Sequence, residues 1–511
     1  MTAEIFGASF LQESLFLSAK DGESAVNVGV VLELLGPLDI PRLVAAIGRL
    51  ASRHEALRTT LTGVDGKVWQ VVAPSAKVPA AVLDLSAEHD PEAEAMRLVK
   101  DHLRRPFALQ GPSLCRVMII TCGPGKHFLS LSLHHAVIDG WSASVLAAEL
   151  RACYCETGAG PIAAPMLQPA DYAAWERQPA DSASLDGWRR QLRGYSTRLR
   201  IPGATGPGPE QLSQAHELPD GGAGASGGVE RLARQLRVPV VAVLAAAVAA
   251  SLREYAGDGT LARDSGLSEP GLIVGLVRAN RERAELRDVV GYLADIAPLT
   301  IDLRGDPEFG GLVDRTAAAL AYSRDHPVPL AALSRLLRAD GGEGPLFDVC
   351  LNYLPGARLQ DQVSGELLMA RVDVKDKEPS ASRWWGGTAL IDYVLRSASP
   401  GQLSGCVRGD LNTLPSSLLA DLADRFWTAL VGGTESPDLR VSELAASVSQ
   451  ATLWPSQSRP MCGRPICSPS PTWKRSGSAP SISGRPTITS PSPSASKDPS
   501  ITACCSTRSG H

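Results

Sequence analysis

Hydrophobic and polar positions alternate with two different periods along most of the chain, and these periods predict strands and helices in succession. Residues 26–35, VNVGVVLELL, form a nearly continuous apolar run that is typical of a buried strand. Between Leu43 and Ala51 the apolar residues instead recur every three or four positions, behind Asp39 as a candidate helix N-cap. This succession continues to about residue 445 and predicts an α/β protein.

Further segments with these two periods fill the rest of that region. Strands are predicted at residues 67–72, 115–121, 127–135, 272–277, 347–353, 367–374, 389–396 and 403–410. Helices are predicted at residues 90–104, 142–154, 171–177, 185–192, 229–236, 239–255, 307–323, 329–338 and 416–430. A Gly-rich stretch at residues 203–228 lies between the two halves of the series, and we interpret it as the connection between two lobes.

The length of 511 residues also favours two lobes, because chains beyond about 250–300 residues rarely build a single core. We predict an N-terminal lobe at residues 1–180, a C-terminal lobe at residues 181–445 and a ligand site between them. Residues 446–511 lack apolar periodicity and are rich in Ser and Pro. We interpret this tail as disordered or as an out-of-frame translation, and we assign it no chemistry.

Composition and charge narrow the classes of partner. Hydrophobic residues make up 44% of the chain, charged residues make up 20%, and the formal net charge is −4. No basic block stands out in the first 440 residues, so neither nucleic acid nor a membrane is expected as a partner. The chain has no run of about 18 apolar residues and no basic signal-peptide start, so a cytoplasmic location is expected. We also expect a monomer.

The cysteines do not form a disulfide framework. Six of the ten are scattered through apolar segments, namely Cys115, Cys122, Cys153, Cys155, Cys350 and Cys406. We interpret these six as free thiols of a cytosolic protein. Because Cys153 and Cys155 have no second pair at metal-binding spacing, no metal site is predicted.

The strongest local signal for chemistry is LHHAVIDGWS at residues 133–142. In the predicted strand, His135 continues a row of alternate leucines, whereas His134 shares the opposite face with two serines. Because adjacent strand residues point apart, the two histidines cannot bind one metal ion. An imidazole beside a turn with Asp139 and Gly140 can act as a base or hydrogen-bond partner in a cleft. The residues alone leave open that His135 is a structural core histidine.

Residues 134–140, HHAVIDG, resemble the HHxxxDG signature of nonribosomal peptide synthetase condensation domains, which belong to the chloramphenicol acetyltransferase-like superfamily. Six further segments resemble other motifs of that family, in the family's order. They are ASFLQESLFL at 8–17, RHEALRTTL at 53–61, ADYAAWE at 170–176, VGYLADIAPL at 290–299, HPVPL at 326–330 and GPLFDVCLNY at 344–353. The resemblance covers about residues 5–445.

The resemblance implies two chloramphenicol acetyltransferase-like α/β sandwich lobes in a V-shape with a central tunnel. Donor and acceptor carrier proteins would insert phosphopantetheine arms into the tunnel from opposite faces. The donor arm carries an acyl or peptidyl thioester and the acceptor arm carries an aminoacyl thioester. The acceptor amine attacks the donor carbonyl, which forms an amide without a covalent acyl-enzyme. The domain itself would bind no cofactor.

The resemblance also assigns roles to the motif residues. His135 would accept the proton of the acceptor amine or hydrogen-bond the tetrahedral intermediate, while His134 orients the loop. Asp139 would form a structural ion pair with Arg281, with Arg283 as the alternative partner.

Three more residues belong to the expected site. Gly140 would leave room for a pantetheine arm or a tight turn. Trp141 is interpreted as a packing residue rather than a contact residue. Arg58, in the LRT part of the motif at residues 53–61, is expected to support the site.

Departures from the family pattern bear on the subtype. Asp295 replaces the usual Asn of the motif at residues 290–299, which would alter the tunnel or its lobe contacts. Ile138 stands where domains that accept L-configured donors often have Ser, which favours a D-donor or acyl-starter subtype. The opening motif keeps Gln12 and Leu15 but lacks its usual Arg and Trp. Trp141 argues against an epimerization domain, and the intact histidines argue against heterocyclization.

Two other functions stay open. An O-acyltransferase of the same superfamily would use His135 as an obligatory base on a hydroxyl, and an inactive domain would only dock carriers. The intact signature argues against the inactive domain. No adenylation motif or carrier-type Gly-Gly-x-Ser site is evident, so we interpret the chain as a lone condensation domain or a fragment of a longer synthetase.

Overall fold

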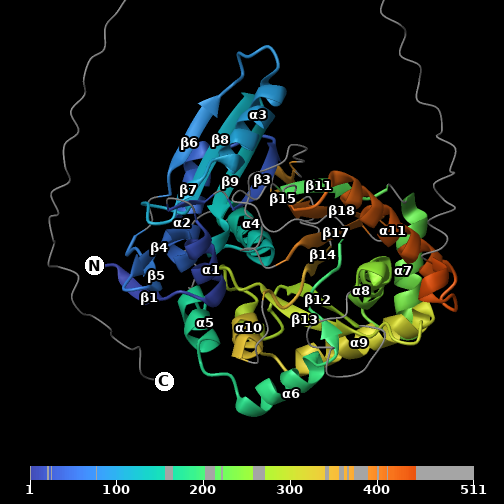
Figure 1. The fold of residues 1–511 in the computed structure, drawn as a ribbon. Helices are drawn as coiled ribbons and strands as arrows, with labels where there is room; N and C mark the ends of the chain where they lie inside the picture. The colour runs from blue at the N-terminus through green and yellow to red at the C-terminus, as the bar shows by residue number, and fades with distance from the viewer. Residues whose placement is uncertain are drawn as a thin grey trace, which may run out of the picture. The chain divides into compact units, whose positions relative to one another are not determined.

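Two β-sheets organise the fold, which is given by a computed structural model (Figure 1). The structure describes residues 2–19, 22–24, 26–75, 78–155, 165–201, 213–219, 222–256, 271–339, 344–355, 362–364, 367–372, 374, 389–399, 402–410 and 413–444. All of them fall within one unit of the chain, Met1–Ala451. The tail predicted at residues 446–511 lies outside the described residues.

The first sheet has six strands in the order β15-β16-β3-β9-β8-β6. Their bounds are β15 (Gln362–Ser364), β16 (Leu367–Arg371), β3 (Asn27–Leu35), β9 (Lys126–His134), β8 (Cys115–Gly123) and β6 (Ala80–Asp84). Helices cover both faces, which explains the continuous apolar run of β3. On one face pack α2 (Ile40–Arg53) and α4 (Gly140–Cys155), and on the other packs α3 (Pro91–Arg104).

We call the part of the protein built on this sheet the first half, and the part built on the second sheet, described below, the second half. Smaller elements complete the first half. A three-stranded antiparallel sheet contains β1 (Glu4–Gly7), β5 (Lys67–Val72) and β4 (Thr59–Val64). A two-stranded sheet contains β2 (Glu23–Ser24) and β7 (Phe107–Ala108). The remaining helices of this half are α1 (Phe10–Ser18) and α5 (Pro169–Glu176), with 3-10 turns at Glu55–Arg58 and His135–Val137. Helix α6 (Ser182–Leu192) packs instead against the second sheet through Trp188 and Leu192. The first turn of α1 is fixed by a capping box between Ser9 and Gln12.

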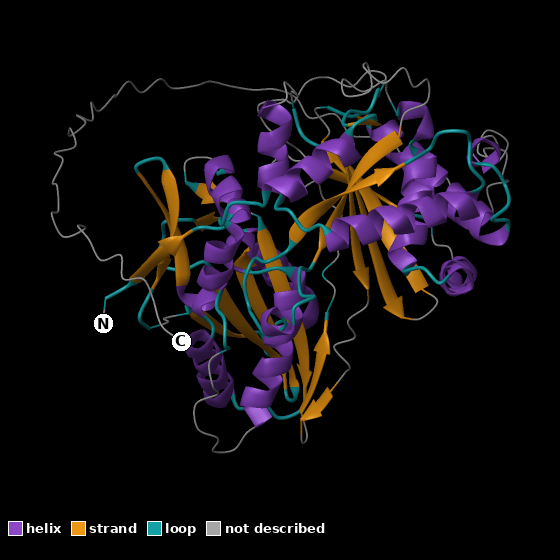
Figure 2. Ribbon diagram, turned by 90° about the horizontal axis from the view of Figure 1, so that it is seen from below, coloured by secondary structure: helices purple, strands orange, loops and turns teal. Residues whose placement is uncertain are grey.

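The second sheet runs β10-β12-β14-β17-β18-β11, and β13 also pairs with β12. The bounds are β10 (Tyr195–Ser196), β12 (Gly271–Arg278), β14 (Val349–Pro355), β17 (Ile391–Ser399), β18 (Gln402–Asp410), β11 (Ser213–Glu217) and β13 (Asp295–Ile301). Its helices are α7 (Gly222–Leu236), α8 (Val240–Ser251), α9 (Phe309–Asp325), α10 (Leu330–Ala339) and α11 (Ser416–Glu435), with 3-10 turns at Arg253–Tyr255 and Ala284–Leu286. Figure 2 shows helices beside both groups of strands.

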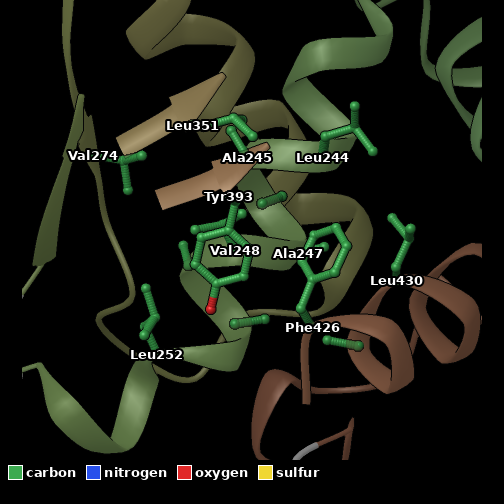
Figure 3. Close-up of a cluster of buried hydrophobic side chains, with 14 of the residues drawn as sticks. Leu244, Ala245, Ala247, Val248, Leu252, Val274, Leu351, Tyr393, Phe426 and Leu430 are labelled. Carbon is green, nitrogen blue, oxygen red and sulfur yellow. The ribbon is translucent and has the colours of Figure 1, made fainter. Parts of the chain in front are cut away.

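The core of the second half is built around α8. This helix is apolar on all sides, and every residue from Ala242 to Ser251 is buried. Figure 3 shows its Leu244 and Val248 among side chains of the sheet and of α11, including Tyr393 and Phe426. Among the described helices none is by itself long and apolar enough to cross a membrane, and only the bent pair 227–236 and 240–251 meets that test when counted together.

The predicted division into lobes needs two corrections. Strand β16 belongs to the first sheet although its residues fall within the predicted second lobe, because Leu367 and Met369 cover the edge of β3 and join the first core. The Gly-rich stretch at 203–228 is not only a connection. Its described part includes β11, which forms an edge of the second sheet, and the first turns of α7.

Candidate functional site

The HHAVIDG segment joins the end of β9 to the start of α4. The His134 N–H donates to the Leu114 carbonyl at 2.9 Å, and the His135 N–H donates to the Val26 carbonyl at 2.8 Å. A 3-10 turn at His135–Val137 follows, and α4 begins at Gly140. The strand was predicted to include His135, but it ends one residue earlier, so this side chain belongs to the turn.

His134 is fully buried, and its contacts fit the predicted orienting role. Its Nδ1 accepts a hydrogen bond from the Ala136 N–H at 3.1 Å, which holds the 3-10 turn. Burial, with a smaller contribution from His135, lowers the pKa of His134 to about 3. The imidazole is therefore neutral at physiological pH.

His135 lies against Tyr292, which comes from the segment before β13. The two ring centroids are 4.5 Å apart, and the ring planes are inclined by 53°. Burial lowers the pKa of His135, although the Asp139 carboxylate acts in the opposite direction. A neutral imidazole can accept a proton or hydrogen-bond a reacting group, so the geometry permits both roles that the sequence left open.

Gln12 braces the turn from α1. Its Nε2 donates to the Ala136 carbonyl at 2.9 Å and to Gln70 Oε1 at 3.1 Å, and Gln70 in turn donates to the Gly7 carbonyl. Gln12 is buried, so these bonds are shielded from water. Gln12 belongs to the opening motif, but the sequence did not predict its place in the site. Its place in the opening motif was the available signal.

Asp139 and Arg281 form a buried ion pair between α4 and the segment after β12. Arg281 Nη2 lies 3.1 Å from Asp139 Oδ2, and both side chains are 2% exposed. The same carboxylate oxygen accepts hydrogen bonds from the Leu293 and Ala294 N–H groups at 3.1 and 3.0 Å. The predicted ion pair is confirmed, and its backbone bonds make Asp139 an anchor that ties the first half of the protein to the second.

The two candidate arginines differ sharply in environment. Burial lowers the pKa of Arg281, while Asp139 opposes this shift. The Arg283 side chain is 65% exposed, and its Nε lies 3.9 Å from Glu285 Oε2. Arg283 therefore contributes at most a weak surface pair.

Ser142 completes the network around Asp139, although it was not predicted as a site residue. Its Oγ lies 2.7 Å from Asp139 Oδ1 and 3.1 Å from Arg281 Nη2. The Oγ also accepts a hydrogen bond from the Gly291 N–H at 3.1 Å. The Ser142 N–H donates to Asp139 Oδ1 at 2.8 Å, so Asp139 caps α4. The D-x-x-S spacing at the helix start was the signal that could have identified it.

Gly140 and Trp141 begin α4 at the surface. A Cβ added to Gly140 would lie 4.0 Å from Leu354 Cδ2, an ordinary contact, and Gly140 is not among the glycines with positive φ. Neither crowding nor a tight turn among the described residues therefore requires glycine here. Trp141 was expected to pack, but it is 44% exposed and is held by a hydrogen bond from its Nε1 to the Arg287 carbonyl at 2.9 Å.

Arg58 lies in the 3-10 turn before β4. Its Nη1 donates to the Ala73 carbonyl at 2.5 Å, and its Nη2 lies 3.7 Å from Glu55 Oε1. These described contacts hold the small sheet and do not reach the HHAVIDG segment. A supporting role for Arg58 in the site stays a prediction.

Asp295, which departs from the family pattern, forms an ion pair with Arg278. Its Oδ2 lies 3.2 Å from Arg278 Nη2 on the paired strand β12. Burial raises the pKa of Asp295, and Arg278 acts against this shift. The charge introduced at this position is therefore balanced within the second sheet. No group of three His, Cys, Asp or Glu side chains among the described residues could hold a metal ion.

Comparison with known proteins gives consistent matches. The family model described as Condensation domain matches residues 4–377. A probable non-canonical nonribosomal peptide synthetase, CymA, from Salinispora arenicola is 29% identical over 86% of the chain. The isonitrile lipopeptide synthase of Mycobacterium tuberculosis is also 29% identical over 86% of the chain. The chain spans only 6% and 18% of the length of these two relatives.

Solved structures share the fold. The first condensation domain of the CDA synthetase superposes with a TM-score of 0.64 at 23% identity, over 87% of this chain and 99% of that one. The SgcC5 protein from Streptomyces globisporus superposes with a TM-score of 0.67 at 21% identity, over 85% of this chain and all of that one.

Proposed function

Because the chain belongs to the condensation-domain family, we propose that it forms an amide between two thioester-bound substrates delivered by separate carrier proteins. The donor is an acyl or peptidyl thioester and the acceptor is an aminoacyl thioester. Each arrives on the phosphopantetheine arm of its own carrier, so the chain needs no cofactor of its own. The carriers are the proposed partners.

The chemistry requires positioning and the handling of one proton. The acceptor nitrogen attacks the donor carbonyl carbon, the C–S bond breaks, and the donor carrier's thiol leaves. An α-amino group has a pKa of about 7.7–8.0, so much of the acceptor starts out protonated at neutral pH. A neutral His135 can take the proton that the nitrogen must lose, a transfer typically worth about 10²–10⁴ in rate.

One observation carries this proposal. His135 has its pKa lowered by burial and stands on a turn whose neighbours are fixed from both halves of the protein. Gln12 bonds the carbonyl of Ala136 on one side, and the Asp139–Arg281 pair anchors the other. A base held this firmly suits a reaction in which two mobile arms must meet a fixed group.

The test is reconstitution with two separately loaded carrier proteins, followed by mass spectrometry of both arms. An amide on the acceptor arm supports the proposal. An ester formed with a hydroxyl acceptor, but no amide with an amine, would identify an O-acyltransferase instead. Binding of both carriers without transfer of the acyl group would identify a docking domain.

The role of His135 is tested with His135→Ala. We expect kcat for amide formation to fall about 10²–10⁴-fold with carrier binding unchanged. His127→Ala is the matched control, because His127 is a buried histidine at the opposite end of β9, where its described ring contacts are with Thr121 and the Gly36 backbone, away from the HHAVIDG segment. Equal rates for His135→Ala and the unmodified chain would remove His135 from the mechanism.

A further inference from the structure

A set of buried polar atoms lies on the face of β9 that carries His134. Among the described residues, four neighbouring side chains each have one buried polar atom without a hydrogen-bond partner, namely Asn27 Oδ1, Arg116 Nε, Ser132 Oγ and His134 Nε2. Ser132 and His134 are completely buried. Such atoms are rare in folded proteins, and an ordered water is a common explanation when several occur together.

Strand pairing brings these four side chains together. Asn27 of β3 is the register partner of His134 on β9, and Arg116 of β8 is the register partner of Ser132. Register partners project to the same face of a sheet, and so do residues two positions apart on one strand. The four side chains therefore form one patch. On the same face, Ser130 Oγ lies 2.9 Å from His102 Nδ1 of α3, so the patch faces that helix.

Contacts at the end of α3 fix two of the four groups. Asn27 Nδ2 donates to the Leu103 and Arg105 carbonyls at 2.8 and 2.9 Å, so the amide cannot flip and Oδ1 faces the patch as an acceptor. The Arg116 guanidinium stacks on Phe107, with its central carbon 3.7 Å from the ring centroid. Its Nε–H, the guanidinium donor nearest the strand, stays available to the patch.

Leu103 covers the patch from α3. Gly29 lies opposite Ser132 on β3, and a Cβ added there would lie only 2.7 Å from Leu103 Cδ2. The leucine thus packs directly over the backbone between the polar side chains. This contact shields the patch from bulk solvent.

The donors and acceptors match one water molecule. His134 Nδ1 accepts the Ala136 N–H, so the proton of the neutral ring resides on Nε2 and makes it a donor. The patch then offers two N–H donors, from His134 and Arg116, and two oxygens, from Asn27 and Ser132. We propose that these four groups bind one ordered water, which accepts from both N–H groups and donates to both oxygens.

This water makes Ser132 and Asn27 positioning residues for the catalytic segment. It holds the second nitrogen of His134, while the Ala136 N–H holds the first, so the ring can neither rotate nor change tautomer freely. The orientation of His134 sets the turn from which His135 projects. The site lies within the described part of the first half and does not include His135, the proposed base.

The first test is a crystal structure of the unmodified chain at a resolution of about 1.5 Å. A water within hydrogen-bond distance of at least three of the four atoms supports the proposal. Direct bonds among the four side chains, or no density between them, would overturn it. This test does not depend on the proposed function.

The second test compares Ser132→Val with Ser130→Val, its matched control on the same face of β9. Valine at position 132 removes one oxygen and occupies the space of the water, whereas position 130 loses only its bond to His102. NMR of ¹⁵N-labelled histidine should show a slowly exchanging Nε2–H of His134 in the unmodified chain and in Ser130→Val, and fast exchange in Ser132→Val. Unchanged exchange in Ser132→Val would contradict the proposal.

The same variants extend the test to the reaction, and this part rests on the proposed function. We expect Ser132→Val to lower kcat for amide formation about fivefold, the effect of displacing the water and so losing its hydrogen bond to His134 Nε2, with KM unchanged. Ser132→Ala leaves room for the water and should retain most of kcat. A fall in activity with the exchange of His134 unaffected would show that Ser132 acts by another route.

Discussion

His134 and His135 are adjacent in the chain, yet the structure gives them different surroundings. His134 is sealed within the first half and bonds the turn, whereas His135 packs against Tyr292 from the second half. Burial lowers the pKa of both imidazoles. Because both are neutral near pH 7, the difference in their roles comes from where each side chain points and not from charge.

The lowered pKa of His135 predicts the pH dependence of the reaction. A histidine with a depressed pKa keeps its basic form below its ordinary value of about 6.5. The acid limb of kcat that belongs to His135 should therefore lie below pH 6.5, which is measured with saturating loaded carriers between pH 5 and 8. His135→Gln identifies this limb, because a limb that persists in the variant belongs to the acceptor amine. A His135-dependent limb centred at pH 6.5 or above would contradict the prediction.

For individual residues, the sequence predicted a role correctly where the residue belongs to a family motif that assigns that role. The pairing of Asp139 with Arg281 was predicted correctly because the family pattern marks both residues. Ser142 was missed since its bonds to Gly291 and Arg281 depend on contacts between distant segments. The surface position of Trp141 was also missed, because an aromatic residue beside a motif gives no indication of its exposure.

Strands β17 and β18 bury an ionisable carboxyl group, and burial changes the pH at which it loses its proton. Asp392 is completely buried on β17, and its register partner on β18 is Arg408, whose Nη2 lies 3.3 Å from the carboxylate. Burial raises the pKa of Asp392 to about 8, although Arg408 opposes the shift. The folded protein therefore holds a proton on Asp392 that the unfolded chain releases above about pH 4.

Linkage then fixes the sign of a stability prediction. The contribution of Asp392 is fully present below its unfolded pKa and is lost as the pH rises through about 8. Asp392→Asn removes the titration, so the melting temperature of the variant relative to the unmodified chain should rise by about 2–4 °C or more between pH 5 and pH 9. Calorimetry at the two pH values measures this difference. A constant difference would mean that Asp392 is ionised in the folded protein throughout.

Asp302→Asn is the control for this experiment. Burial opposes the shift, but bonds from Arg304 lower the pKa of Asp302, so this carboxylate is ionised in both the folded and unfolded states above pH 5. Its variant should lose stability by the same amount at pH 5 and pH 9. Parallel behaviour of the two variants would point to a general effect of pH on the fold.

The position of a helix or strand along the chain was predictable from the sequence. The sheet to which a strand belongs was not predictable where the chain returns from one half of the protein to the other. The apolar pattern of the sequence predicted β3, α2 and α8, because the apolar residues of each of these elements are buried in a core. The pairing of β16 with β3 could not be read from the sequence, since a strand's alternation identifies its faces but not its partner. The assignment of β16 to the second lobe failed for this reason.

For the whole molecule, the predicted α/β fold with two groups of strands is confirmed by the two sheets and by the fold shared with a solved condensation domain. The chloramphenicol acetyltransferase-like superfamily was given by the resemblance of the motifs and stays a prediction. The V-shape and the tunnel stay predictions. The group around Asp139 ties the two halves together, because Asp139 has bonds to Ser142 of α4, to Arg281 and to the Leu293 and Ala294 backbone. Its integrity should affect the fold and the site together.

Arg281→Ala tests this dependence, with Arg283→Ala as the matched control two residues away. Removal of Arg281 leaves the Asp139 carboxylate buried without its cation, and breaking such a pair typically costs about 3–5 kcal/mol. Urea denaturation at pH 7 should show this loss for Arg281→Ala and a change below about 0.5 kcal/mol for the exposed Arg283→Ala. Arg281→Ala should also slow amide formation, because Asp139 fixes the start of α4 beside His135. Equal stability of the two variants would show that the backbone N–H groups alone suffice to hold the Asp139 charge.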